Sequence, residues 1–126
     1  MINNSLSKGK ILIIEDDAVL AKMYAKKFEN DGFQVILVFS GREATIAVER
    51  EMPNVIVLDI MLPAIDGFTI IRNIKQNPNI KDIPIVILTN LGTSQIIIDE
   101  AKKLGVKNYL IKYKTATREV VRVVEE

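Results

Sequence analysis

The chain has 126 residues, of which 48% are hydrophobic and 26% charged, as expected for one globular domain with its own core. Lysine and arginine number 17 against 16 acidic residues, so the net charge of +1 gives no reason to expect direct binding to nucleic acid or a membrane. The chain has no cysteine and no histidine. Disulfides, thiolate or imidazole metal sites and histidine-based catalysis are therefore excluded.

The first nine residues are polar and predict a flexible tail (1–9) ahead of a single domain (10–126). They contain no apolar segment of the kind that a signal peptide needs. The apolar runs in the rest of the chain are also much shorter than a membrane span. We therefore expect a cytoplasmic protein.

The first third of the chain predicts two strands and the starts of two helices. Apolar runs over residues 11–14 and 35–38 are typical of strands that are buried on both faces. Asp17 is placed to cap a helix that reaches about residue 30 and ends before Gly32. Its inward stripe repeats every fourth residue and consists of Leu20, Tyr24 and Phe28.

The second helix and the third strand follow directly. The segment Ser40-Gly41-Arg42-Glu43 has the pattern of a capping box, in which serine and glutamate bond each other's backbone N–H groups. Residues 55–58 form the third apolar run. Asp66 is then placed to cap a third helix, whose inner side would carry Ile70, Ile71 and Ile74.

The last third of the chain repeats the alternation. Apolar runs cover residues 85–88 and 109–111, and a helix is expected between them from about 94 to 104, closed by Gly105. A final helix is expected from about residue 115, with one apolar stripe made of Val120, Val123 and Val124. Alternating strands and helices predict an α/β fold with one parallel five-stranded sheet and helices on both faces.

Polar side chains gather where the predicted strands end. In an open parallel sheet the carboxyl ends of the strands lie at one edge, where ligands bind. Taken alone, each of these residues has an ordinary explanation as a helix cap, a strand residue or a surface charge. Their joint placement favours a site made of Glu15, Asp16, Asp59, Thr89 and Lys112.

Three carboxylates at one edge repel each other. At an effective dielectric constant near 20, one pair of charges about 4 Å apart costs roughly 4 kcal/mol. A hard cation relieves this repulsion, and Mg²⁺ prefers oxygen ligands and bridges carboxylates to phosphate oxygens. The cation would also keep Asp59 ionised as a nucleophile, and carboxylates do form phosphoryl adducts.

With these motifs the chain resembles the receiver domain of two-component response regulators, from about residue 10 to residue 124. The most specific part of the resemblance is Asp59-Ile60-Met61-Leu62-Pro63 followed by Asp66-Gly67. The acidic segment 15–17, the pair Leu88-Thr89 and the segment 109–112 add to it. The resemblance implies a flavodoxin-like doubly wound fold with strand order 2-1-3-4-5.

The resemblance also implies a role for each matching residue. Asp59 matches the phosphoacceptor, and the Mg²⁺ ligands would be Asp16, Asp59 and the backbone carbonyl of Met61, with Glu15 acting through water. Thr89 and Lys112 match the hydroxyl and the cation that bind the phosphoryl group. Tyr109 matches an aromatic residue that turns inward on activation, with Thr89 as the other switch residue; a half-buried strand tyrosine is the alternative.

Two positions depart from the pattern of the family. Tyr113 stands where a cis proline usually follows the lysine, and a non-proline cis bond costs about 2.5–4 kcal/mol, so we expect a trans bond and an altered turn. Asn90 stands where a small residue is usual, beside the phosphoryl group. We expect it to narrow access to the site and to slow the loss of the phosphoryl group.

The leading hypothesis is a signalling switch, not an enzyme with an external substrate. Its partners would be a histidine kinase or phosphotransfer protein, which supplies the histidine that this chain lacks, and a downstream protein or a missing output domain. The alternative is a degenerate receiver that binds partners without phosphorylation. Two enzyme classes are less favoured. A flavin binder needs a phosphate-binding loop after the first strand, where residues 15–17 would repel phosphate, and an aspartyl-phosphate phosphatase usually has its nucleophile on the first strand and needs a larger cap. No GxxxxGK[ST] loop is present either.

Overall fold

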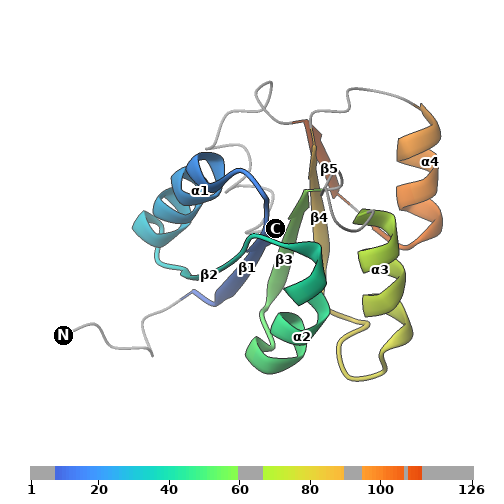
Figure 1. Cartoon of the computed structure of the whole chain (residues 1–126), viewed down its shortest axis with the longest axis horizontal. Coiled ribbons are helices and arrows are strands. Elements are labelled where there is room, and N and C mark those ends of the chain that lie inside the picture. The colour runs from blue at the N-terminus through green and yellow to red at the C-terminus, as the bar shows by residue number, and fades with distance from the viewer. Residues whose placement is uncertain (1–7, 60–66, 90–94, 107, 112–126) are drawn as a thin grey trace.

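The computed structural model of the chain describes residues 8–59, 67–89, 95–106 and 108–111. Five strands alternate with four helices in these ranges (Figure 1). The strands are β1 (Lys10–Ile14), β2 (Gln34–Val38), β3 (Val55–Asp59), β4 (Ile85–Thr89) and β5 (Asn108–Ile111). The helices are α1 (Ala18–Asn30), α2 (Gly41–Glu51), α3 (Gly67–Gln76) and α4 (Gln95–Lys103).

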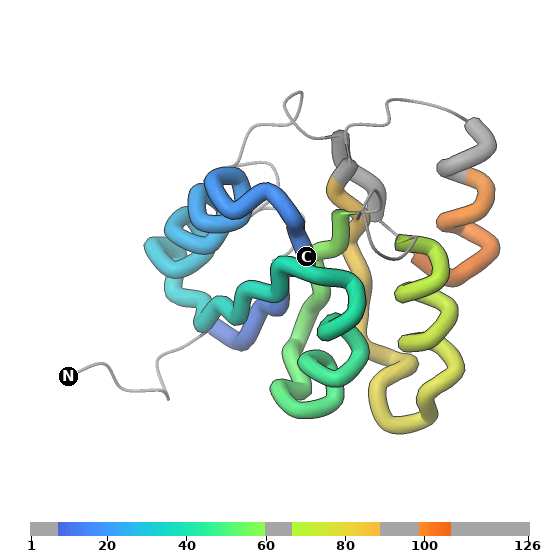
Figure 2. Tube along the Cα trace, viewed as in Figure 1, coloured from blue at the N-terminus to red at the C-terminus, as the bar shows by residue number. Residues whose placement is uncertain are grey.

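The strands form one parallel sheet in the order β2-β1-β3-β4-β5. Strands β1 and β3 are neighbours in the sheet although α1, β2 and α2 lie between them in the sequence (Figure 2). The order reverses between these two strands, because the chain moves outward to β2 from one and outward to β4 from the other. The predicted parallel α/β fold with flanking helices is thus confirmed.

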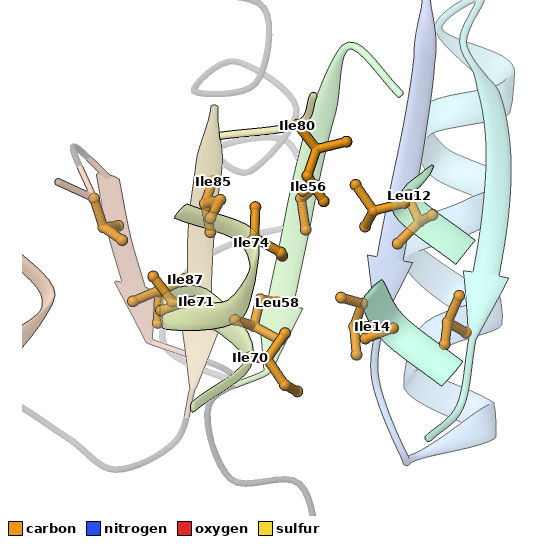
Figure 3. Close-up of a cluster of buried hydrophobic side chains, with 14 of the residues drawn as sticks. Leu12, Ile14, Ile56, Leu58, Ile70, Ile71, Ile74, Ile80, Ile85 and Ile87 are labelled. Atoms are coloured by element: carbon orange, nitrogen blue, oxygen red, sulfur yellow. The ribbon is translucent and has the colours of Figure 1, made fainter. Parts of the chain in front are cut away.

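Both faces of the sheet are buried, which explains why the strands are continuously apolar. Figure 3 shows the face that α2 and α3 cover, where isoleucine and leucine side chains fill the space between the helices and the strands. Helix α1 covers the opposite face with Leu20, Tyr24 and Phe28, as the apolar residue at every fourth position predicts. Alternate residues of one strand face opposite sides, so Ile11 and Ile13 meet α1 while Leu12 and Ile14 meet the other layer.

The caps of the first two helices show which local predictions succeed. The Asp17 side chain accepts a hydrogen bond of 3.0 Å from the Leu20 backbone N–H, so Asp17 is the cap of α1. Ser40 caps α2, but its hydroxyl accepts from the N–H of Arg42, at 3.1 Å. The N–H of Glu43 instead donates to the backbone carbonyl of Ser40. The helix start is therefore confirmed, while the capping-box bond from Ser40 to Glu43 is corrected.

The later helix predictions are tested only in part. The inner side of α3 carries Ile70, Ile71 and Ile74, which are all buried. Gly105 follows α4 with a φ of +84°, and its N–H donates to the carbonyl of Lys102, as expected for a glycine that closes a helix. The expected Asp66 cap and the last helix lie outside the described residues.

Two backbone hydrogen bonds tie residues just ahead of β1 to the segment that leads into β2. The N–H of Lys8 donates to the carbonyl of Gly32, and the N–H of Gln34 donates to the carbonyl of Gly9, both at 2.9 Å. Lys8 and Gly9, which the sequence places in the tail, thus join the amino-terminal end of the β1–β2 pair. Residues 1–7 lie outside the described residues.

Candidate functional site

Glu15, Asp16 and Asp59 lie together at the carboxyl ends of β1 and β3. One carboxylate oxygen of each residue lies within 4.8 Å of one from each of the other two. The strands are neighbours at the point where the order of the sheet reverses, which is why residues from distant parts of the chain meet there. The three predicted acidic residues therefore form one cluster.

The three carboxylates differ in their exposure. Asp59 is 3% exposed and Glu15 is 1% exposed, whereas Asp16 is exposed at the rim. Asp59 is the last residue of β3 and pairs in register with Leu88 of β4, so its backbone is fixed by the sheet. Burial of a charged carboxylate costs free energy unless other groups compensate the charge. The cluster thus holds Asp59, the candidate nucleophile, shielded from solvent, with the solvent-exposed Asp16 beside it.

The start of α1 helps to orient the cluster. The backbone N–H of Asp17 donates a hydrogen bond of 3.1 Å to Oε1 of Glu15. The N–H of Glu15 donates to the carbonyl of Val38, at 3.0 Å, which extends the pairing of β1 with β2 by one residue. Glu15 is therefore held through both its side chain and its backbone. The sequence suggested the cap at Asp17 but gave no sign of this second bond.

The chemistry of the cluster fits Mg²⁺. All three groups are hard oxygen ligands, and Mg²⁺ usually takes only one or two protein carboxylates and keeps several waters. Mg²⁺–oxygen distances are about 2.1 Å, so three oxygens within 4.8 Å of one another are close enough to share one ion, directly or through a water in its shell.

The other predicted site residues are described only in part or not at all. Thr89 ends β4 and its backbone pairs with Ile111, and Tyr109 lies in β5 opposite Ile87, which places both backbones in the two strands beyond β3. Their side chains lie outside the described residues. Met61, Lys112, Asn90 and Tyr113 also lie outside them.

None of the helices in the described ranges is a candidate to span a membrane.

The comparison with protein families matches residues 11–124 to the response regulator receiver domain. The chain is 34% identical over 106 residues to a probable transcriptional regulator, ycf27, from Guillardia theta, which covers 84% of the chain and 40% of that protein. It is also 30% identical to the phosphate regulon transcriptional regulatory protein PhoB of Rhizobium meliloti. This match covers 82% of the chain and 45% of that protein. The chain therefore spans less than half the length of these curated relatives.

Solved structures agree with the family match. A response regulator structure from Chloroflexus aurantiacus has 30% identity and a TM-score of 0.84, over 93% of this chain and 94% of that one. The BeF3-activated receiver domain of Klebsiella pneumoniae RstA also has 30% identity, with a TM-score of 0.79, over 90% of this chain and 94% of that one. From the parallel sheet, the acidic cluster and these matches, we conclude that the chain belongs to the response regulator receiver domains of two-component signalling.

Proposed function

We propose that this domain is a phosphorylation-dependent switch that accepts a phosphoryl group on Asp59 with Mg²⁺ bound at the acidic cluster. The carboxylate cluster carries the proposal, since it brings Glu15, Asp16 and Asp59 within 4.8 Å of one another. Such a cluster is costly without a cation, and phosphoryl transfer needs a cation beside the acceptor. Membership of the receiver family supports the same function.

The proposed transfer uses Asp59 as the nucleophile. One oxygen of its carboxylate forms a bond to phosphorus while the bond from phosphorus to the donor nitrogen or oxygen breaks and the donor keeps that electron pair. The burial of Asp59, at 3% exposure, limits competition by water around the acceptor oxygen. Bound Mg²⁺ would neutralise charge on the phosphoryl oxygens.

Each cluster residue has a distinct role in this proposal. Asp16 and Asp59 would bind the metal directly, and Glu15, held by the Asp17 N–H, would bind it through water. The Met61 carbonyl would be the third direct protein ligand. These roles follow the match to the receiver family and the oxygen chemistry of the site.

The groups that read the phosphoryl state would come from the outer strands. Thr89 would donate its hydroxyl to a phosphoryl oxygen and Lys112 would pair with the added charge, of roughly −1.5 to −2. Thr89 and Tyr109 would then move as the switch. The backbone placement of Thr89 at the end of β4, next to β3, supports its part in this proposal.

The proposed partners follow from what the chain lacks and from its family. Receiver domains interact with histidine kinases and output domains, and this chain has no histidine of its own, so a kinase or phosphotransfer protein would be the donor. Two of the curated relatives, ycf27 and PhoB, are named as transcriptional regulators and extend well beyond the matched region. We propose that the signal passes to an output domain in that additional length or to a separate protein. The cytoplasmic location expected from the sequence stays a prediction.

One experiment tests the proposal directly. The chain is incubated with Mg²⁺ and a small acyl-phosphate donor, and its intact mass is measured over time. One added phosphoryl group is expected in the wild type and none in Asp59→Asn, which keeps the size of the side chain but removes its charge. The proposal fails if neither this donor nor any histidine kinase yields an adduct, and the degenerate receiver then becomes the preferred function.

The same experiment tests the expected effect of Asn90. Removing the donor after labelling allows the loss of the phosphoryl group to be followed. A slow loss is expected, because the asparagine side chain is larger than the residue usual at that position. Loss within seconds would contradict this expectation, and Asn90→Ala is the matched variant that should lose the group faster.

A further inference from the structure

Strand β2 forms an outer edge of the sheet and carries no charged residue. Strand β2 has the sequence Gln-Val-Ile-Leu-Val, and within the part of the chain that the structure describes it pairs only with β1. Natural sheets usually protect such edges with a charged residue, a proline or a bulge. Strand β2 has no charge and no proline, and its parallel register with β1 runs without interruption from Gln34 to Val38. This edge is therefore chemically ready to pair with another strand.

The hydrogen bonds of β2 show which backbone groups face outward. The N–H of Gln34 donates to Gly9, and the carbonyl of Val38 accepts from Glu15, so both residues direct their backbone groups toward β1. Backbone groups of successive strand residues point to opposite sides, so Ile36 also faces β1. Val35 and Leu37 are left with their N–H and C=O groups directed outward. Two residues with two groups each make a short hydrogen-bonding edge that no other described strand pairs with.

This edge is complementary to a second copy of itself. We infer that two copies of this chain associate through antiparallel pairing of their β2 strands, about a twofold axis at Ile36. In this register Val35 of one copy faces Leu37 of the other, and each such pair exchanges two hydrogen bonds. All the outward groups of Val35 and Leu37 in both copies are then used. The two Ile36 residues face each other as a pair without hydrogen bonds, about 4.5 Å apart at Cα.

The residues beyond β2 fit the same register. Phe39 is 41% exposed, which is unusual for a large aromatic side chain, and it would lie opposite the half-buried Phe33 of the second copy. Aromatic cross-strand pairs stabilise antiparallel sheets. One step further out, Gly32 would lie opposite Ser40, so no like charges oppose each other along the edge. The exposed Phe39 thus gains a partner without electrostatic cost.

The choice of a second copy as occupant follows from this symmetry. The same strand supplies both sides of the contact, which is the form of most homodimers. A net charge of +1 gives little repulsion between copies. Because one short strand and its flanks make a small interface, we expect weak association, with a dissociation constant between about 10 µM and 1 mM.

The absence of cysteine allows a clean cross-linking test. Ile36→Cys should form a disulfide across the twofold axis under mild oxidation, because facing residues in a pair without hydrogen bonds have closely spaced Cβ atoms. Gln34→Cys is the matched control on the same strand. Residue 34 would lie opposite residue 38, so the two copies of residue 34 would be about 14 Å apart, too far for a disulfide. At least tenfold more covalent dimer is expected for Ile36→Cys.

Hydrogen exchange of the wild type gives a second test without substitution. At a concentration ten times the dissociation constant, about one fifth of the chains are free, so the amides of Val35 and Leu37 should exchange about fivefold more slowly than at high dilution. The amide of Ile36 faces β1 in both states and should be much less affected. If Ile36→Cys fails to fold, this measurement alone decides.

The inference is overturned by any of three results. The first is that amide hydrogen exchange at Val35 and Leu37 does not depend on protein concentration up to 1 mM. Sedimentation at 1 mM would then also show a monomer. The second is equal cross-linking of the two cysteine variants. The third is association that protects other strands or helices and leaves these amides unchanged, which would place the contact elsewhere.

Discussion

The carboxylate of Glu15 lies 3.1 Å from the backbone nitrogen of Asp17, whose own carboxylate caps α1. The acidic cluster and the first helix therefore begin at the same turn of the chain. Of three consecutive acidic residues, Glu15 and Asp16 belong to the cluster and Asp17 belongs to the helix. This division leads to a prediction that separates folding from metal binding.

Replacement of Asp17 by alanine should weaken the domain without removing the metal site. The loss of the cap is expected to lower the free energy of unfolding by about 1 kcal/mol, measured by urea denaturation. The backbone N–H that binds Glu15 remains, so the Mg²⁺ affinity should change less than threefold. Asp17→Asn keeps a capping oxygen and is the control that should retain the stability. A tenfold loss of Mg²⁺ affinity in Asp17→Ala alone would show that Asp17 belongs to the metal site.

Mg²⁺ should stabilise the wild type and have little effect on Asp59→Asn. At a Mg²⁺ concentration ten times the dissociation constant, binding to the folded state adds about 1.4 kcal/mol to the free energy of unfolding. Without Mg²⁺ the variant should be at least as stable as the wild type, because one of three mutually repelling charges is gone. Thermal unfolding with and without the metal measures both effects. Equal stabilisation of the two proteins by Mg²⁺ would contradict a site that includes Asp59.

Helix α3 should depend strongly on its buried isoleucines. Ile74 is fully buried against the sheet (Figure 3). Ile74→Ala is expected to lower the free energy of unfolding by roughly 2–5 kcal/mol, because apolar burial is lost and a cavity is left behind. Ile74→Val should cost about 1 kcal/mol. Ile46 is 65% exposed on α2, and Ile46→Ala is the matched control with an expected effect below about 0.5 kcal/mol. Similar losses at both positions would contradict the assigned packing.

Glu51 should contribute an acid-sensitive part of the stability. Its side chain accepts from Arg50 at 3.1 Å and from Lys10 at 3.3 Å, and these bonds hold the pKa of Glu51 below its ordinary value of 4.5. A carboxyl whose pKa is lower in the folded state stabilises the fold above the unfolded pKa, and this contribution is lost as the pH falls through the folded pKa.

The matched variant for this effect is Glu51→Gln, which keeps an acceptor oxygen but does not titrate. The wild type should be the more stable protein at neutral pH. The difference between the two should shrink as the pH falls below 4.5. Denaturant unfolding at several pH values measures it, and a difference that grows on acidification would have the wrong sign for this ion pair.

The parts of the fold that the sequence predicts well are those set by local rules. Continuous apolar runs mark strands that are buried on both faces, and Asp17 marks the start of α1, because each signal acts within a few residues. The end of α2 has no such signal. Met52 closes that helix in the left-handed conformation, with a φ of +46°, although glycine or asparagine is usual there. No local pattern around Met52 predicts this choice.

The residues of the site were predictable from the sequence, but the contacts that orient them were not. That Glu15, Asp16 and Asp59 meet follows from the rule that parallel strands end at one edge. The bond from Asp17 to Glu15 depends on the path of the chain between strand and helix, and the outward direction of Val35 and Leu37 depends on the register with β1. Register is a property of two paired strands, so a single segment of sequence does not reveal it.

The pairing of β1 with β3 also sets the order in which the chain can fold. The N–H of Lys10 donates to the side chain of Asn54, 44 residues later, and the N–H of Asn54 donates back to the carbonyl of Lys10. During synthesis β1 therefore cannot pair with β3 until residues 55–59 have been made, whereas α1, β2 and α2 are made earlier. Closing so long a loop precedes any gain from the contact, so the sheet should form slowly compared with its helices. Until then, an early intermediate would leave the β3-facing side of β1 unpaired, although Ile11, Leu12, Ile13 and Ile14 are almost fully buried in the folded domain.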